Sequence, residues 1–213
     1  MDELATHAKD ERLMRRCFDL AVESARCGGY PYAAIVARHG RTIVETTNRV
    51  SHDGDVTRHA EIVALAQAQK TLRRTSLDDC TLYANVEPCA LCAYAIRETR
   101  IAKVAFGLTS PIMGGHSRWN ILGDRRLSAA MPEVFAPPPE VLANFMSLEA
   151  EAAMRRASPI VWAVARSRGL FVCERARPPP PSLAEPSPPR PMKETAMRFI
   201  RRRVFDRFGR GGC

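Results

Sequence analysis

The sequence predicts an α/β fold, in which helices cover both faces of a β-sheet. First, segments with apolar residues at helical spacing alternate with short β-prone segments over residues 10–106, and strands separated by helices form a sheet with helices on both sides. Second, 213 residues of which 46% are hydrophobic suit one well-packed domain. Third, there is no run of eighteen apolar residues, which disfavours a membrane span.

The first part of the chain supplies a helix, a hairpin and a second helix. Apolar residues recur at helical spacing over residues 10–27, and a glycine pair follows as a stop signal. Residues 32–37 and 41–46 are short β-prone runs around a His-Gly turn, which predicts a β-hairpin. The next helix is expected over residues 59–71, with a threonine or aspartate before it as a cap.

The middle of the chain supplies the rest of the predicted sheet. Residues 81–85 and 101–106 are expected as strands, because both are short β-prone runs. A helix over residues 89–97 connects them. Residues 111–119 (PIMGGHSRW) are polar and broken by glycines, which predicts a loop.

The last part of the chain divides into the end of the domain and two further segments. A helix is predicted over residues 139–155, and the apolar run 160–165 fits either a strand or a buried helix. The domain is expected over residues 1–170. A linker is expected over residues 171–191, which contain the proline-rich stretch PPPPSLAEPSPPRP. Residues 192–213 form a basic tail, either amphipathic and able to bind an anionic partner or simply solvated.

The distribution of charge limits the partners. The chain carries a net charge of +9, but residues 171–213 hold ten Lys or Arg and four Asp or Glu and account for +6 of it. A groove for a polyanion needs a cation for each phosphate that it neutralises, so the small excess on the domain favours a small-molecule substrate. The charged start of the chain has no signal-peptide core, and the cysteine count is odd, so we expect a reducing, cytoplasmic location.

Four residues are candidates for the chemistry. His59 and Glu61 lie at the start of one predicted helix, and Cys89 and Cys92 lie three residues apart at the start of another. Residues three apart share a helix face, so both thiolates can hold one ion. One imidazole and two thiolates leave the fourth position of a zinc ion open to water, as in catalytic sites. The alternatives are ordinary buried thiols, or a closed structural site completed by Cys80, Cys27 or His116.

These residues belong to a longer pattern. It consists of Asn48, DVTRHAE at residues 55–61, CTLY at 80–83, EPCALC at 87–92, and Arg100 with Ile101. The pattern resembles the cytidine and deoxycytidylate deaminase superfamily, in particular guanine deaminases and bacterial tRNA adenosine deaminases. The resemblance implies a three-layer α/β/α fold with a mixed sheet of about five strands. It also implies a homodimer, zinc ligands His59, Cys89 and Cys92, a proton shuttle, Glu61, and a substrate contact, Asn48.

The chemistry of hydrolytic deamination supports these roles. Water is too weak a nucleophile at neutral pH unless a bound metal such as zinc lowers its pKa. A carboxylate beside that water can take its proton and then protonate the ring and the departing amine, so Glu61 is expected as the catalytic base and acid. The main chain around Ala60 and Pro88 is expected to orient the water and the ring.

Three further residues are candidate substrate contacts. The Asn48 amide offers a donor and an acceptor to a base or a ribose hydroxyl; the alternative is an asparagine whose side chain closes a turn. In the loop at residues 114–119, Trp119 can stack on a ring and His116 can bond to it. The alternatives are a surface histidine and a tryptophan packed under the loop.

We therefore expect a zinc-dependent hydrolytic deaminase that releases ammonia from a purine base such as guanine or a nucleoside such as adenosine. The first alternative is a tRNA adenosine deaminase that makes wobble inosine, because the strands at residues 81–83 and 100–107 look more like the tRNA enzymes. The second alternative is a zinc-stabilised binding module without turnover. Glu61 argues against it, since a purely structural site has no use for that acid.

Overall fold

The structure is a computed structural model that describes residues 3–173, and it confirms the predicted α/β fold. Its strands form one five-stranded sheet in the order β2-β1-β3-β4-β5. β1 pairs antiparallel with β2 and β3, whereas β3, β4 and β5 are parallel, so the sheet is mixed. The elements in chain order are α1 (Glu3–Arg26), β1 (Ala33–Arg38), β2 (Arg41–Thr47), α2 (Val50–Asp53), α3 (Ala60–Leu72), β3 (Cys80–Val86), α4 (Ala90–Glu98), β4 (Lys103–Leu108), α5 (Arg125–Ala130), β5 (Glu140–Leu142), α6 (Ser147–Ala157) and α7 (Pro159–Ser167).

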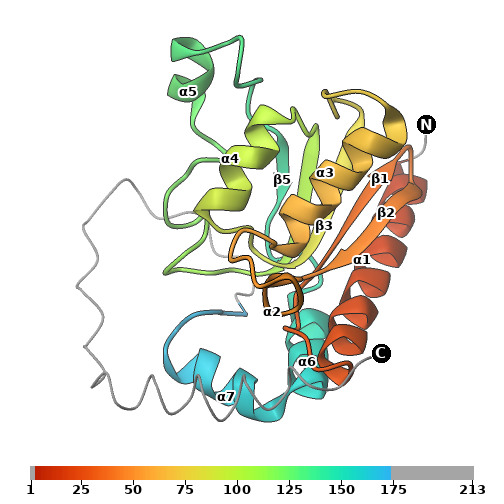
Figure 1. The fold of residues 1–213 in the computed structure, drawn as a ribbon, viewed down its shortest axis with the longest axis vertical. Coiled ribbons are helices and arrows are strands. Elements are labelled where there is room, and N and C mark those ends of the chain that lie inside the picture. The colour runs from red at the N-terminus through yellow and green to blue at the C-terminus, as the bar shows by residue number, and fades with distance from the viewer. Residues whose placement is uncertain (1–2, 174–213) are drawn as a thin grey trace.

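Helices cover both faces of this sheet, as Figure 1 shows. α1 and α6 pack together on one face, and α3 and α4 contact each other on the opposite face. The side chains of β1 alternate between the two cores: Ile35 belongs to the core with α1, and Ala34 and Val36 belong to the core with α3. Both faces of the strand are therefore buried, which explains its unbroken apolar sequence.

The predicted hairpin is confirmed as β1 and β2. Its two connecting residues, His39 and Gly40, have φ angles of 51° and 75°. Positive φ at both positions matches the right-handed twist of the two strands, and glycine adopts it without steric cost.

The prediction of a helix over residues 139–155 is wrong in its first part. Residues Glu140–Leu142 form β5, an edge strand that pairs in parallel with β4, and α6 begins only at Ser147. Asn144 and Met146 have φ angles of 57° and 56°, which are left-handed conformations that separate the strand from the helix. The fifth strand of the expected sheet is this short segment.

The apolar run 160–165 is helical, within α7. Ser158 caps this helix, because its side chain accepts a hydrogen bond from a main-chain N–H of the first turn. Beyond α7, Phe171 is buried and Val172 makes an isolated antiparallel bridge with Thr109, just after β4. Residues 174–213, which hold most of the expected linker and the whole basic tail, lie outside the described residues.

The longest helix, α1, has 24 residues and two different sides. Leu13, Met14 and Phe18 are buried in the core that α1 shares with the sheet and α6. Its other side carries charged residues, of which Arg16 forms an ion pair with Glu45 at 2.8 Å. Within residues 3–173, no helix combines the length and the apolar character needed to cross a membrane.

Candidate metal centre

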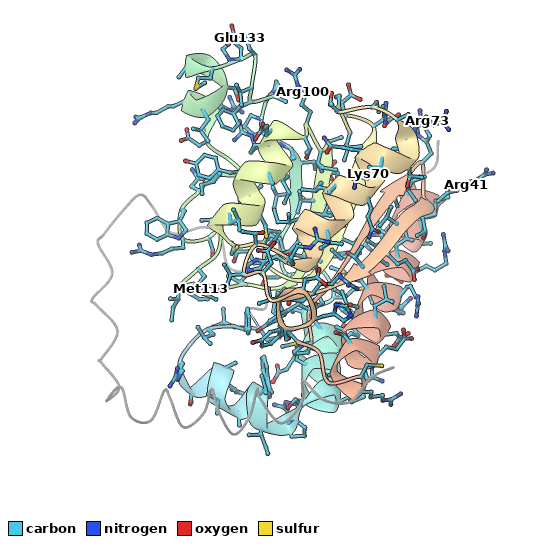
Figure 2. The ribbon with its side chains drawn as sticks, viewed as in Figure 1. Arg41, Lys70, Arg73, Arg100, Met113 and Glu133 are labelled. Carbon is cyan, nitrogen blue, oxygen red and sulfur yellow. The ribbon has the colours of Figure 1, made fainter. Side chains whose placement is uncertain are left out.

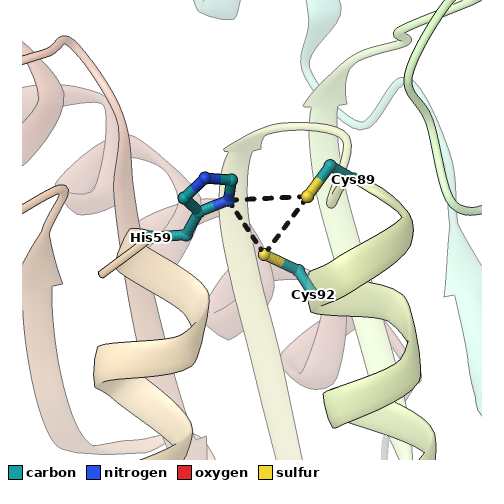
Figure 3. Close-up of side chains that lie close together, drawn as sticks. All are labelled: His59, Cys89 and Cys92. Carbon is teal, nitrogen blue, oxygen red and sulfur yellow. Dashed lines mark hydrogen bonds between the residues drawn. The ribbon is translucent and has the colours of Figure 1, made fainter. Parts of the chain in front are cut away.

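Two helices on the same face of the sheet begin at the predicted motif residues. His59 is the N-cap residue of α3, and Cys89 is the N-cap residue of α4, each with an extended backbone conformation. Cys92 lies in the first turn of α4, on the side that Cys89 also occupies. Because α3 and α4 are neighbours, the three side chains converge on one point (Figure 3).

The spacing of the three donor atoms fits a tetrahedral zinc ion. His59 Nδ1 lies 3.4 Å from the Sγ atoms of both Cys89 and Cys92, and the two Sγ atoms lie 3.7 Å apart. Zinc bonds of about 2.3 Å to sulfur and about 2.0 Å to nitrogen put tetrahedral S–S and N–S edges at about 3.8 Å and about 3.5 Å. The side chains therefore already lie at three corners of such a tetrahedron.

Hydrogen bonds among the three side chains shift the pKa of each of them. The hydrogen bonds that Cys89 shares with Cys92 and with His59 hold the pKa of Cys89 at about 4, although burial raises it. The hydrogen bond to Cys89 and burial raise the pKa of Cys92 well above its ordinary value. The hydrogen bond to Cys89 also raises the pKa of His59. A cation bound here would replace these protons, since metal ligands must be deprotonated.

Glu61 lies beside this cluster in the first turn of α3. Its side chain is buried, with the whole residue 6% exposed, and burial raises the pKa of its carboxyl to about 7. Hydrogen bonds to its own main chain and to Cys92 act in the opposite direction. The carboxylate is not one of the three donors that group within 4.8 Å of one another. Glu61 therefore can exchange protons beside the cluster without completing the ligand set.

The residues considered as a fourth ligand are Cys80, Cys27 and His116. In the part of the chain that the structure describes, none of them joins the three-residue cluster. Cys80 begins β3, at the opposite end of that strand from Cys89, and its Sγ contacts Asp79 and Arg74. The arrangement is therefore an open set of three donors.

Asn48 follows β2, and in the described part of the chain only the oxygen of its side-chain amide is used to hold the fold. Its side-chain Oδ1 accepts a hydrogen bond from Val50 N at 3.0 Å and so closes a turn. Its Nδ2 makes no hydrogen bond within residues 3–173 and can donate to a ligand. The next residue, Arg49, donates its main-chain N–H to the carbonyl of Arg58 at 2.9 Å. This bond joins the residue after Asn48 to the residue before His59.

Ala60 and Pro88 are buried and offer only main-chain atoms. The Ala60 carbonyl accepts a hydrogen bond from Thr46 Oγ1 at 2.8 Å, and the Pro88 carbonyl accepts one from Gly115 N, also at 2.8 Å. Both carbonyls are thus used to hold the turns that carry His59 and Cys89.

The two loop residues His116 and Trp119 lie in different environments. The His116 ring meets the edge of Phe106, with centroids 6.0 Å apart, and its Nδ1 is buried without a partner among the described residues. Burial lowers the pKa of His116, so the ring is neutral at pH 7. Trp119 is 55% exposed and carries the Arg118 guanidinium 4.7 Å from its ring centroid. The tryptophan is therefore at the surface and not packed under the loop.

Sequence reasoning missed two features beside the cluster. One is the buried carboxylate of Glu87, which appeared only as a letter of the EPCALC motif. The other is an arginine pair: Asp53 binds Arg49 at 2.8 Å and Arg58 at 3.0 Å through its two oxygens. The spacing of these residues held no signal for either feature, because both depend on how loops fold back.

Comparison with known proteins gives consistent matches. The family described as "Cytidine and deoxycytidylate deaminase zinc-binding region" matches residues 7–108. The tRNA-specific adenosine deaminase of Haemophilus influenzae is 34% identical over 121 residues, which cover 56% of this chain and 70% of the relative. The guanine deaminase of Bacillus subtilis is 40% identical over 87 residues, or 40% of this chain and 56% of the relative, so the chain spans about half of that enzyme.

A solved structure gives the same fold. It comes from a study of A-to-I editing by tRNA:A34 deaminases, and it superposes with a TM-score of 0.56 at 27% sequence identity. The superposition covers 65% of this chain and 98% of the other. The sheet and its two helical layers are therefore shared across nearly all of that protein.

Proposed function

Because the chain belongs to the cytidine and deoxycytidylate deaminase family, we propose that it is a zinc-dependent hydrolase that deaminates a purine base, free or within a nucleoside. The observation that carries the proposal is the triangle of His59, Cys89 and Cys92 with the buried Glu61 beside it. An open set of three donors next to a carboxyl group is what hydrolysis at a metal requires.

His59, Cys89 and Cys92 would hold the zinc ion. One nitrogen and two sulfur donors suit this metal better than magnesium or calcium, which prefer oxygen. When bound, zinc supplies the positive charge that brings the pKa of a water molecule near neutrality. The N-terminal ends of α3 and α4 favour the negative charge of the two thiolates.

Glu61 would move the protons of the reaction. Its carboxylate takes a proton from the water whose oxygen bonds to the ring carbon. It then delivers protons to the ring nitrogen and to the amino group, which leaves as ammonia when the carbon–nitrogen bond breaks. Burial of Glu61 limits competition from bulk water for these protons.

Asn48, Ala60 and Pro88 would orient the substrate. The free Nδ2 of Asn48 donates a hydrogen bond to a carbonyl of the base or to a ribose hydroxyl. The carbonyls of Ala60 and Pro88 accept hydrogen bonds from Thr46 Oγ1 and Gly115 N, so these turns are fixed and would present the water and the ring to Glu61 in one orientation. Trp119 offers an exposed ring on which a base could stack, whereas His116 packs against Phe106 and would not contact that ring.

The distribution of cations supports a free base or nucleoside as the first substrate class. Arg97 is buried, where it donates to main-chain carbonyls, and Lys103 is bound to Asp10. Figure 2 shows Arg41 and Arg73 where α3 ends, at the opposite end of that helix from His59. A polyanion bound at the metal centre would find few of these charges.

A second candidate, deamination of adenosine in tRNA, is favoured by the arginine pair. Asp53 holds Arg49 and Arg58 next to Asn48 and His59, and the terminal nitrogens of Arg58 make no hydrogen bond in the described part of the chain. These nitrogens could bind a phosphate of a polynucleotide whose base enters the site. The third hypothesis is a zinc-stabilised binding module without turnover, and it assigns no role to the buried Glu61.

We place the enzyme in the cytoplasm as a homodimer. Thiols that hold a metal must stay reduced, which fits the cytoplasm. The outer side of α4 exposes Leu91 (47%) and Tyr94 (45%), so a second copy would cover apolar surface on this helix. The basic tail at residues 192–213 lies outside the described residues, and its role with an anionic partner stays a prediction.

Ammonia release tests the proposal. The zinc-loaded protein is incubated with guanine, adenine, their nucleosides, cytosine and tRNA, and ammonia is measured for each. Release from a purine base or nucleoside supports the leading proposal, and release from tRNA alone supports the second candidate. No release from any of them, with zinc bound, would favour the binding module.

A further inference from the structure

Glu87 is a buried carboxylate two residues before Cys89, and the mechanism above does not use it. The residue is 3% exposed. A carboxylate in such a place is costly unless hydrogen bonds satisfy its oxygens. The partners of Glu87 therefore indicate what it does.

Among residues 3–173, the four hydrogen-bond donors to the Glu87 carboxylate all come from the loop that follows β4. Its Oε2 accepts from Ser110 N at 2.6 Å and from Ser117 Oγ at 2.7 Å. Its Oε1 accepts from His116 N at 2.9 Å and from Ser117 N at 2.6 Å. The beginning and the middle of the loop are thus bound to one charged group, and hydrogen bonds to an ionised acceptor are the strong ones.

The same loop rests directly on the turn that carries Cys89. Gly115 donates its N–H to the Pro88 carbonyl at 2.8 Å, and Gly114 forms an isolated antiparallel bridge with Cys89. A side chain at Gly114 would overlap the Glu87 carboxylate, and one at Gly115 would overlap Ala93. The loop therefore has room for glycine only at its contact with the metal centre.

We propose that Glu87 is a positioning residue that fixes the loop at residues 110–119 as one wall of the substrate site. The inference rests on the proposed deaminase function. Gly114 pairs with Cys89, one of the three donors, so the loop borders the cluster at which a base would bind. The two oxygens of one carboxylate bind two parts of the loop. This fixes the position of Trp119, whose ring is exposed, before substrate arrives.

Two variants test this role and a third is the matched control. Glu87→Gln keeps the size of the side chain but turns an amide donor toward donors of the loop. Ser117→Ala removes one of the four hydrogen bonds to Glu87, together with the bond from Ser117 Oγ to the Ser110 carbonyl, and leaves the carboxylate in place. Thr109→Val is the control, because Thr109 Oγ1 binds Asn144 at 2.6 Å at the base of the same loop without contacting Glu87.

The readouts are zinc content, amide hydrogen exchange over residues 110–119, and kcat and KM for the preferred purine. We expect Glu87→Gln and Ser117→Ala to keep their zinc and to exchange faster in the loop. KM should rise about tenfold for Glu87→Gln and less for Ser117→Ala, with kcat changing less than KM, because the loop positions substrate and does not react with it. Thr109→Val should lose thermal stability while its KM and loop exchange stay as in the wild type.

The outcomes separate the two proposals. Wild-type exchange and KM in both test variants would overturn the role of Glu87, as would an equal rise of KM in Thr109→Val. If Glu87→Gln does not fold, Ser117→Ala decides by the same measurements. A wild-type protein that deaminates nothing contradicts the proposed function, whereas the exchange data still report whether Glu87 fixes the loop.

Discussion

His59 Nδ1 lies 3.4 Å from Cys92 Sγ, although 33 positions of sequence separate the two residues. The contact exists because each residue stands at the start of a helix and both helices lie on one face of the sheet. Helix starts are rigid and present side chains to a common point, which suits a site where the ligand atoms must be placed before the ion arrives.

Metal binding and chemistry should separate by mutation. Glu61→Gln should keep about one zinc per chain and lose nearly all turnover, because it removes the proton carrier and no ligand. Cys89→Ala should lose both, since it removes a ligand. Zinc content and ammonia release are measured on the purified variants.

The matched control for the cysteine variant is Cys80→Ala. Cys80 is also buried but lies at the far end of β3, so its loss should leave the zinc content unchanged. Zinc missing from the Glu61→Gln protein would assign the carboxylate to the ligand set and contradict the mechanism.

The sequence predicted the group of His59, Cys89 and Cys92 because each of its two parts is a local motif at a helix start, although tertiary structure brings the parts together. Cys89 and Cys92 share a face of one helix turn, and a histidine with a nearby glutamate at another helix start supplies the remaining donor and acid. The covered sheet followed in the same way from unbroken apolar strands such as β1.

What the sequence did not show depends on tertiary contacts. The donors to Glu87 lie 23 to 30 positions away in a loop with no pattern of its own. β5 is three residues long and is a strand only because β4 leaves an edge for it to pair with. The exposure of Trp119 likewise depends on how its loop folds back over Pro88.

Acid stability should depend on Asp79. Burial raises the pKa of its carboxyl, but hydrogen bonds from Arg74 and Arg38 outweigh this and lower it to about 2. A depressed pKa stabilises the folded state above the ordinary pKa of aspartate, and the contribution is lost as pH falls from about 4 to about 2. Asp79→Asn should therefore cost about 1 kcal/mol at pH 7, after allowance for solvent screening, and less at pH 2.

Urea unfolding at both pH values measures this difference. Asp78→Asn is the control. The Asp78 side chain is 66% exposed, and its Oδ1 lies 3.6 Å from Arg74 Nη1, so it is a more solvated partner of the same arginine. Equal destabilisation by both substitutions, or a cost of Asp79→Asn that does not shrink at low pH, would contradict the assignment.

The oligomeric state should depend on the outer side of α4. Leu91→Glu puts a charge into the surface proposed to meet a second copy, so the protein should become monomeric. Leu148→Glu on α6 is the matched control, since Leu148 is 57% exposed and lies on the other face of the sheet. Sedimentation velocity distinguishes the states. A dimer that survives Leu91→Glu would move the interface elsewhere.

Removal of the chain from Pro178 onward should leave the rate on a small substrate within about twofold, because a proline-rich linker separates the segments that it joins. Steady-state rates of the full chain and the shortened chain are compared under identical conditions. A large drop in a protein that keeps its thermal transition would show that the tail contributes to the site or to assembly.

The substrate class should be a free purine base or nucleoside and not tRNA. The reason is the small number of cations around the metal centre among the described residues, chiefly the arginine pair on Asp53 and Arg118 over the Trp119 ring. In competition at near-physiological salt, kcat/KM for the best purine should exceed that for inosine formation in tRNA. Arg58→Ala tests the arginine pair: it should lower any activity on tRNA and reduce its salt dependence by about one counterion.

Arg100→Ala is the control for this variant, because Arg100 follows the C-terminal end of α4, away from the cluster at its N-terminal end (Figure 2). Higher kcat/KM on tRNA than on any purine, with a steep loss as salt is added, would overturn the choice. In that case a loss of tRNA activity in Arg58→Ala but not in Arg100→Ala would assign the phosphate contact to the arginine pair. Loss in both variants would instead indicate that tRNA covers the whole length of α4.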